Sequence, residues 1–440
     1  MISRAALRDV RRVLFALDSP WRNLLVAMGV GVLGALAVEA FRTVLFALEM
    51  GLVGAHDGHL VPAARELEPE IRLLVPVIGG PAVGMLLWLA EGAHSTKPSR
   101  FTGDYIEAVA IGNGRLDLRG GVLKILASLV VVSTGGAVGR EGAMILLSAM
   151  AASWIGRLAG ETLELRLMVS CGAAAGLAAA YHTPLAGAVF VAEILLGSLV
   201  LAQLGPVVVA AVVSHGITIA LVGPGIRFPM ATVPMLGASQ AMVMLAFAPI
   251  SGIAGAALLY WLELARRSFT KLALPLPLPL VLGGLLVGVL SLWRPEVWGN
   301  GDSGVRQQID GLWPWQTVAL VLAFKLLAVA ATTGSGAPGG VFTPTLFVGA
   351  AFGALLSAAL AALGYTGAAE PVYAVLGMAT LLAGTTHAPV MAALMVAEMT
   401  GQYSLLAVFL PACVVTTLVS QRLHPRSIYG LRAPTEEPEP

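Results

Sequence analysis

Residues 139–142 read Gly-Arg-Glu-Gly and place an arginine and a glutamate inside an otherwise apolar stretch. Charged residues in such surroundings are costly, about 2.5–3.5 kcal/mol each at the centre of a membrane helix, and they mark function by default. The residues that follow, MILLSAMAASWIG, predict a helix that begins here. Because a helix N-terminus carries partial positive charge and unsatisfied N–H donors, it suits an anion.

The Glu141 carboxylate lies on the first turn of this predicted helix, so it could occupy the anion position itself. When protonated or displaced, it would leave the position to a free anion, which is the behaviour of a gate. The alternative is an internal ion pair between Arg140 and Glu141 that has no transport role.

Residues 334–342, GSGAPGGVF, repeat the arrangement later in the chain. Their glycines precede a second predicted helix, FTPTLFVGAAFGALL, and would present the backbone amides of Val341 and Phe342. Pro344 falls in the first turn of that helix, where its missing N–H does no harm. A plain turn between two helices is the alternative.

The two segments belong to an internal repeat. An offset of 201 positions pairs a lysine and two glycines, namely Lys124 with Lys325, Gly135 with Gly336 and Gly139 with Gly340. Further on, HTPLAGAVFVAEI begins at His182 and HAPVMAALMVAEM begins at His387. Because rare residue types match, two repeated halves are indicated, and transporters built from such halves bind substrates where the halves meet.

Polar residues at matched places in the repeat have structural interpretations as well. Glu193 and Glu398 are expected to cap helices or to pair inside the bundle. His182 and His387 precede prolines and are expected at helix entries. Lys124 and Lys325 are expected to stabilise buried negative charge or helix C-termini, since cations suit both.

Composition places the chain in a membrane. Apolar types make up 57 % of its 440 residues and charged types only 12 %, and the mean hydropathy is +0.85. A soluble domain carries roughly a quarter charged residues, so lipid must be the main solvent here. A net charge of +1 gives no basic surface for nucleic acid. Cys171 and Cys413 lie in apolar runs without metal-ligand spacing, which favours core packing and predicts no metal site.

Several apolar stretches are shorter than the ~20 residues of a full crossing, and others, such as 184–222 and 372–399, are longer. Glycine and proline interrupt many of them, which is typical of transporters with discontinuous helices. We expect a cytoplasmic amphipathic helix over 1–18, a first membrane repeat over 19–222, a second over 223–430 and a disordered tail over 431–440. Arginines near both ends predict that both termini face the cytoplasm.

These motifs together resemble the CLC family of chloride channels and chloride–proton exchangers. GREGA is similar to the GREGP signature of that family, and GSGAPGGVF to its second filter segment. AGLAAAYHTPLAGAVFVAEI resembles its AGLAAAFNAPLAG stretch, and EMTGQYSLL and SIYGL match later segments. The resemblance covers roughly residues 100 to 430 in the same order, and it indicates a bacterial type without CBS domains.

The resemblance implies an all-α integral membrane fold, with many tilted and discontinuous helices in two inverted-topology repeats. It implies a homodimer in the inner (plasma) membrane that transports chloride and protons and is not an enzyme. Bound chloride ions are expected and no other cofactor. Glu141 would be the external gate and proton carrier. The other implied anion-binding residues are Asn113, Arg140, Gly142, Val341, Phe342 and Tyr429.

Three departures from the family pattern bear on mechanism. The first filter segment reads GNGRL instead of GSGIP, so the Asn113 amide replaces a serine hydroxyl as a possible donor. Ile194 follows Glu193, where exchangers of the family carry a second glutamate and channels an apolar residue. Chloride/proton antiport and passive conduction therefore both stay open. GREGA in place of GREGP is a mild change beside Glu141.

Two further hypotheses compete with chloride transport. Fluoride-exporting relatives also alter the first filter segment, but they usually lack the C-terminal tyrosine, so Tyr429 favours chloride. An intramembrane serine protease could use Ser335 with His387 or His182. That hypothesis leaves the repeat and Glu141 without a role.

Overall fold

The computed structural model describes residues 19–56, 60–91, 104–110, 113–159, 164–197, 201–230, 236–365 and 370–430. The helix expected over 1–18 and the tail expected over 431–440 lie outside these residues. Within them the chain is helical, and its only extended pairing is one isolated β-bridge.

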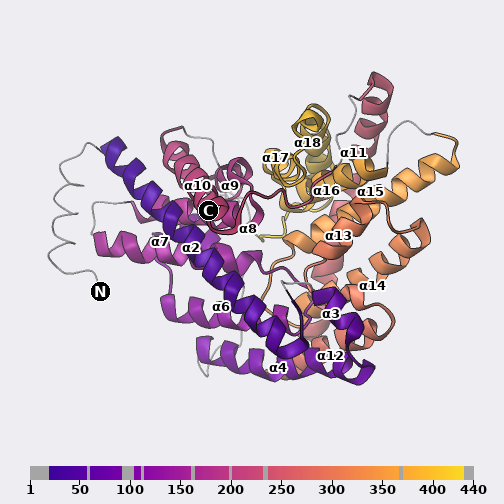
Figure 1. Cartoon of the computed structure of the whole chain (residues 1–440), viewed down its shortest axis with the longest axis horizontal. Coiled ribbons are helices and arrows are strands. Elements are labelled where there is room, and N and C mark those ends of the chain that lie inside the picture. Colours follow the sequence, from indigo (N-terminus) through magenta and orange to yellow (C-terminus); the bar gives the residue numbers. More distant parts are fainter. Residues whose placement is uncertain are drawn as a thin grey trace, which may run out of the picture. The chain divides into compact units, whose positions relative to one another are not determined.

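Figure 1 colours the helices in their order along the chain. Those up to residue 222 are α2 (Ser19–Val53), α3 (Leu60–Glu66), α4 (Pro69–Glu91), α5 (Asp104–Ala110), α6 (Leu118–Ser133), α7 (Glu141–Ala159), α8 (Leu165–Tyr181), α9 (Pro184–Phe190), the π-helix η2 (Val191–Leu196) and α10 (Leu201–Val222). Those after it are α11 (Ala238–Lys271), α12 (Leu278–Trp293), the 3₁₀ turn η3 (Pro295–Val297), α13 (Asp302–Ile309), α14 (Trp315–Gly334), α15 (Phe342–Ala362), α16 (Glu370–Thr386), α17 (Pro389–Thr400), the 3₁₀ turn η4 (Tyr403–Leu405) and α18 (Leu406–Leu423).

Helices long enough to cross a membrane alternate with shorter apolar ones. Among the described residues seven segments have the length and composition of a crossing: Trp21–Val53, Pro69–Ala90, Leu204–Val222, Ala238–Lys271, Trp315–Gly334, Phe342–Ala362 and Tyr403–Leu423. Four more are apolar but shorter, namely Leu165–Tyr181, Pro184–Leu196, Leu278–Trp293 and Pro389–Thr400. The chain is therefore a multi-pass membrane protein with discontinuous helices.

A histidine ends a helix at equivalent places in the two halves of the sequence. His182 closes α8 and His387 follows α16, with φ of 60° and 59° in the left-handed region. Two residues later Pro184 and Pro389 each take the first helical position, which suits their fixed φ and missing N–H. The two histidines thus end one helix and allow the next in equivalent places of the two halves.

A π-helix explains a small offset in the repeat. Three residues separate Glu193 from Gly197, whereas two separate Glu398 from Gly401. The first of these segments is wound as η2, and a π turn accommodates one extra residue. Gly197 and Gly401 then end their helices in the same left-handed conformation, with φ of 62° and 71°.

Contacts divide the chain into two compact units. The first unit holds Met1–Thr43, Asp104–Val122 and Ala143–Arg227, and the second holds Val44–Gly103, Leu123–Gly142 and Phe228–Pro440. The repeat boundaries expected at 222 and 223 concern sequence similarity rather than compactness, and they stay a prediction.

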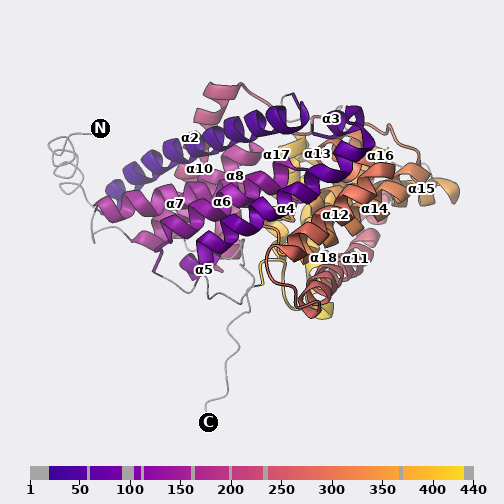
Figure 2. The same cartoon turned by 90° about the horizontal axis from the view of Figure 1, so that it is seen from below.

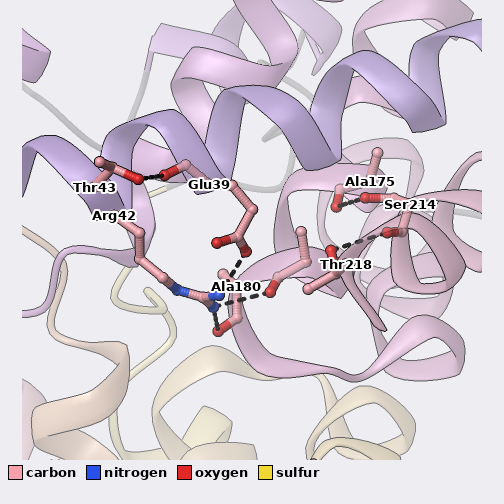
Figure 3. Close-up of polar contacts among 8 residues, drawn as sticks. Glu39, Arg42, Thr43, Ala175, Ala180, Ser214 and Thr218 are labelled. Atoms are coloured by element: carbon pink, nitrogen blue, oxygen red, sulfur yellow. Dashed lines mark hydrogen bonds and ion pairs between the residues drawn. The ribbon is translucent and has the colours of Figure 1, made fainter. Parts of the chain in front are cut away.

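In the first unit, Arg42 anchors α2 to the end of α8 (Figure 3). Its guanidinium donates to the carbonyl oxygens of Ala179 and Ala180, both at 3.1 Å, and pairs with Glu39 at 2.6 Å. The last carbonyls of a helix lack intrahelical donors, and a cation there also suits the helix dipole. The arginine therefore provides hydrogen-bond donors for the last carbonyls of α8, just before His182 ends the helix.

In the second unit, small residues let helices approach closely. α4 and α12 run side by side, as do α11 and α18 (Figures 1 and 2). A Cβ on Gly353 of α15 would collide with the carbonyl of Tyr373 on α16, so this crossing requires glycine. Cys171 and Cys413, one in each unit, are buried and not joined by a disulfide, which confirms their expected packing role.

Candidate functional site

The two glycine-rich segments meet at the isolated β-bridge. The Gly139 N–H donates to the Gly340 carbonyl at 2.6 Å, and the Gly340 N–H donates to the Gly139 carbonyl at 2.8 Å. These glycines are equivalent in the sequence repeat. Reciprocal bonds between two equivalent residues are what a two-fold relation produces. The bridge therefore joins two glycines that the sequence repeat pairs.

Further contacts lock the two segments together. The Ala137 N–H donates to the Thr332 hydroxyl at 3.1 Å, and that hydroxyl donates to the Ala328 carbonyl at 2.9 Å. A Cβ on Gly339 would collide with the side chain of Val138. The backbone-to-backbone approach thus depends on glycine in the second segment.

Two helices begin directly after the bridge. Glu141 is the first residue of α7, and Phe342 is the first residue of α15, with Val341 in the N-cap position. A Cβ on Gly340 would stand 3.6 Å from the Gly142 nitrogen, so the two helix starts are neighbours. Helix N-termini carry partial positive charge, and two of them here face the same small region.

The Glu141 carboxylate lies on the bridge itself. The side chain is buried, with 3 % of its surface exposed, and a Cβ on Gly139 would collide with its Oε2 atom. Asn300 donates to Oε1 through Nδ2 at 3.1 Å. Thr343, in the first turn of α15, also interacts with the carboxylate. A negative group is therefore held between the two helix starts.

Arg140 has a different partner from the one the internal ion-pair alternative requires. Its guanidinium lies 5.5 Å from the ring centroid of Phe46 on α2, a cation–π geometry. Its charge also acts on Glu49, a carboxylate on the same helix that is 2 % exposed. Asn300, not Arg140, is the direct hydrogen-bond partner of Glu141. Arg140 instead contributes positive charge beside the site.

The other predicted residues lie on separate loops. Tyr429 is half-buried on the segment after α18, and this segment is tied to the end of α16 by a bond from the Ile428 N–H to the Thr385 carbonyl at 3.0 Å. Asn113 is exposed and belongs to the first unit. The structure thus brings Glu141 together with Gly142, Val341 and Phe342.

Sequence reasoning missed Asn300 and did not identify the hydrogen-bond acceptors of Lys325. Lys325 is completely buried in α14 and donates to the carbonyls of Val297, Trp298 and Gly299 at 2.8, 3.3 and 2.7 Å. It was expected to stabilise buried negative charge or helix C-termini, and Val297 is the last residue of η3, while the Asp302 carboxylate acts on the same ammonium. The other two carbonyls belong to the loop that leads to Asn300. A lysine in an apolar helix was the available signal for this loop, whereas Asn300 stands in a polar run that indicated only a turn.

A family model described as "Voltage gated chloride channel" matches residues 79–421, most of the chain. The chain belongs to the CLC family. The "Voltage-gated ClC-type chloride channel ClcB" of Salmonella dublin is 45 % identical over 418 residues, covering 94 % of this chain and 99 % of that protein. The protein of the same name from Escherichia coli is 43 % identical over 413 residues, with 93 % and 98 % covered.

Solved CLC structures share the fold. "A slow cyanobacterial Cl-/H+ antiporter" superposes with a TM-score of 0.80 at 23 % identity, covering 94 % of this chain and 97 % of that one. "A CLC-type fluoride/proton antiporter" gives 0.75 at 22 % identity, with 92 % and 96 % covered. These matches confirm the expected all-α CLC fold.

The CLC family consists of channels and transporters, so the chain is not an enzyme and the protease hypothesis is wrong. Ser335, its proposed nucleophile, donates instead to the Thr332 carbonyl of its own helix at 2.8 Å.

Proposed function

We propose that this CLC protein moves chloride across the membrane past the Gly139–Gly340 bridge, with Glu141 as the gate. The observation that carries the proposal is the Glu141 carboxylate, buried on the bridge between two helix starts. The relatives that are 43–45 % identical over most of the chain are named chloride channels, which supports the choice of anion.

The gate follows from elementary electrostatics. The same groups stabilise an ionised carboxylate and a chloride ion, namely N–H donors, helix N-termini and a nearby guanidinium. While Glu141 is ionised, its carboxylate occupies this region and accepts the bond from Asn300. Once protonated it loses its charge-assisted bond from Asn300 and competes poorly, so a chloride ion can take its place. Arg140, Gly142, Val341 and Phe342 then surround the anion.

Chloride/proton antiport is the form of transport that we propose, since Glu141 would carry a proton each time it yields to an anion. The antiporters among the solved CLC structures support this form. Passive conduction is the second candidate, and it is favoured by Ile194, which cannot carry a proton. Tyr429 would donate its hydroxyl to the anion from the cytoplasmic side, which distinguishes the proposal from fluoride transport.

The proposal also covers the membrane location and the oligomeric state of the protein. We place the protein in the inner (plasma) membrane as a homodimer with both termini in the cytoplasm. The seven crossing-length helices among the described residues and the similarity to ClcB proteins support the membrane location. Asn113 remains the proposed donor at an inner anion position.

Purified protein in liposomes provides the test. Chloride should leave chloride-loaded vesicles once an ionophore removes the opposing voltage, and a chloride gradient should drive protons uphill. Glu141→Gln should abolish proton movement and keep chloride flux, while the matched change Glu398→Gln, at a buried carboxylate on α17, should keep both. If no small anion crosses, the proposed function is wrong. Chloride flux without proton movement in the unmodified protein would select passive conduction.

A further inference from the structure

The Asn300 carboxamide connects the gate to the start of α13. Its Nδ2 donates to Glu141 Oε1 at 3.1 Å, and its Oδ1 accepts from the Asp302 backbone N–H at 3.2 Å. An amide can be turned by 180° in a structure unless its partners decide the orientation. Here the backbone N–H requires the oxygen on its side, so the NH₂ group must face the glutamate.

The loop that carries Asn300 is held rigidly. The Lys325 ammonium donates hydrogen bonds to three consecutive backbone carbonyls, from Val297 to Gly299. The lysine side chain has no exposed surface. The Gly299 N–H also donates to the Gly135 carbonyl at 3.4 Å. On the other side of Asn300, Gly301 adopts a φ of 96°, and a Cβ there would stand 3.1 Å from the Phe347 side chain. The carboxamide is therefore delivered to Glu141 by a fixed backbone.

The charged groups around the loop of residues 297–302 also influence one another. The Asp302 carboxylate acts electrostatically on both Glu141 and Lys325. A fully buried ammonium requires compensation, which three carbonyls and this carboxylate provide. Two acidic groups near each other repel. The Asn300 donor stabilises ionised Glu141, and Lys325 balances the charge of Asp302.

We propose that Asn300 is a positioning residue for the gate, because it holds ionised Glu141 over Gly139 and so sets the pH at which the gate opens. Lys325 acts indirectly, because it fixes the backbone of residues 297–299, which leads to Asn300. The inference rests on the proposed function of Glu141. The transport mechanism described above needs a carboxylate that can leave the bridge, and Asn300 determines how readily it leaves.

Asn300→Ala is the direct test, with chloride flux from liposomes measured across a range of pH. A donor to a carboxylate favours its ionised form, and losing a charge-assisted bond changes such an equilibrium by roughly 10- to 150-fold. The pH of half-maximal flux should therefore rise by about one to two units.

Asn300→Asp separates gate positioning from loop folding. It keeps an acceptor for the Asp302 N–H but replaces the donor with a like charge, so it should raise the same pH further. The matched control is Gln308→Ala. Gln308 lies on α13, is 1 % exposed, and in the described structure its side chain makes no hydrogen bond. It should leave the pH dependence unchanged.

The outcomes separate this inference from the proposed function. A protein that conducts chloride with the same half-maximal pH in both Asn300 variants overturns the inference and leaves the function standing. A shift that persists when Asn300→Ala is combined with Glu141→Gln also overturns it, because Asn300 would then act elsewhere. An unmodified protein that passes no anion overturns the function and the role of Asn300 with it.

Discussion

Gly139 and Gly340 offer a matched pair of substitutions at equivalent places in the repeat. Neither glycine has a positive φ, so alanine is conformationally allowed at both. A Cβ at position 139 would collide with the Glu141 Oε2 atom and approach the Gly340 carbonyl to 3.2 Å. At position 340 the nearest atoms would stand at 3.6 and 3.7 Å, which is ordinary contact. Only Gly139→Ala should therefore disturb the gate.

The size of the effect follows from the bond that must break. The carboxylate is the flexible end of its side chain, so it can move aside without unfolding the bridge. Doing so gives up the bond from Asn300, and a hydrogen bond to a charged group contributes about 1.5–3 kcal/mol. Removing that stabilisation shifts the equilibrium of the gate by roughly 10- to 150-fold towards the displaced state.

Chloride efflux from liposomes at a pH where the unmodified protein is mostly closed is the appropriate assay. Gly139→Ala should raise the initial rate and weaken its pH dependence, while Gly340→Ala should behave like the unmodified protein. Equal effects of the two substitutions would refute the reasoning. So would a folded Gly139→Ala protein with unchanged flux, because the carboxylate would then not lie where the geometry places it.

Two other matched pairs test the packing around the site, with the midpoint of thermal unfolding in detergent as the measurement. Lys325→Met leaves three loop carbonyls without their donor and should cost about 3 kcal/mol or more, whereas Lys124→Met, at the half-buried equivalent lysine, should cost less. Equal losses would contradict this view of Lys325. Gly135→Ala meets both a φ of 88° and the Trp298 ring at 2.5 Å, so it should cost about 1–3 kcal/mol more than Gly336→Ala, which meets only a φ of 85° in open space. Similar midpoints for these two variants would contradict the prediction, because the Trp298 ring would then move aside at little cost.

The elements that sequence predicted well are those with rare residue types at repeated spacing. Glycine, proline and histidine fix backbone conformation locally, so the two glycine-rich segments and the helix breaks at His182 and His387 follow from the residues themselves. The pairing of Gly139 with Gly340 could be anticipated only as two halves that meet. Which atoms pair was decided by the tertiary arrangement.

The residues that sequence missed act across long separations. Asn300 reaches Glu141 over 159 positions, and nothing in a single asparagine within a polar loop indicates such a contact. Lys325 was conspicuous in an apolar helix, but its partners are backbone carbonyls, which carry no sequence signal. The break of 184–222 into α9, η2 and α10 was likewise hidden, because Ala, Val and Leu suit a straight and a broken helix alike.

The position of the anion tests the central claim most directly. Crystals grown in bromide, which replaces chloride and scatters anomalously, should show a peak in contact with the backbone amides of Val341 and Phe342. Glu141→Gln should add or strengthen a peak beside Gly139, where the carboxylate now lies. Bromide peaks found only at other places, with none near the Gly139–Gly340 bridge in either protein, would contradict the account.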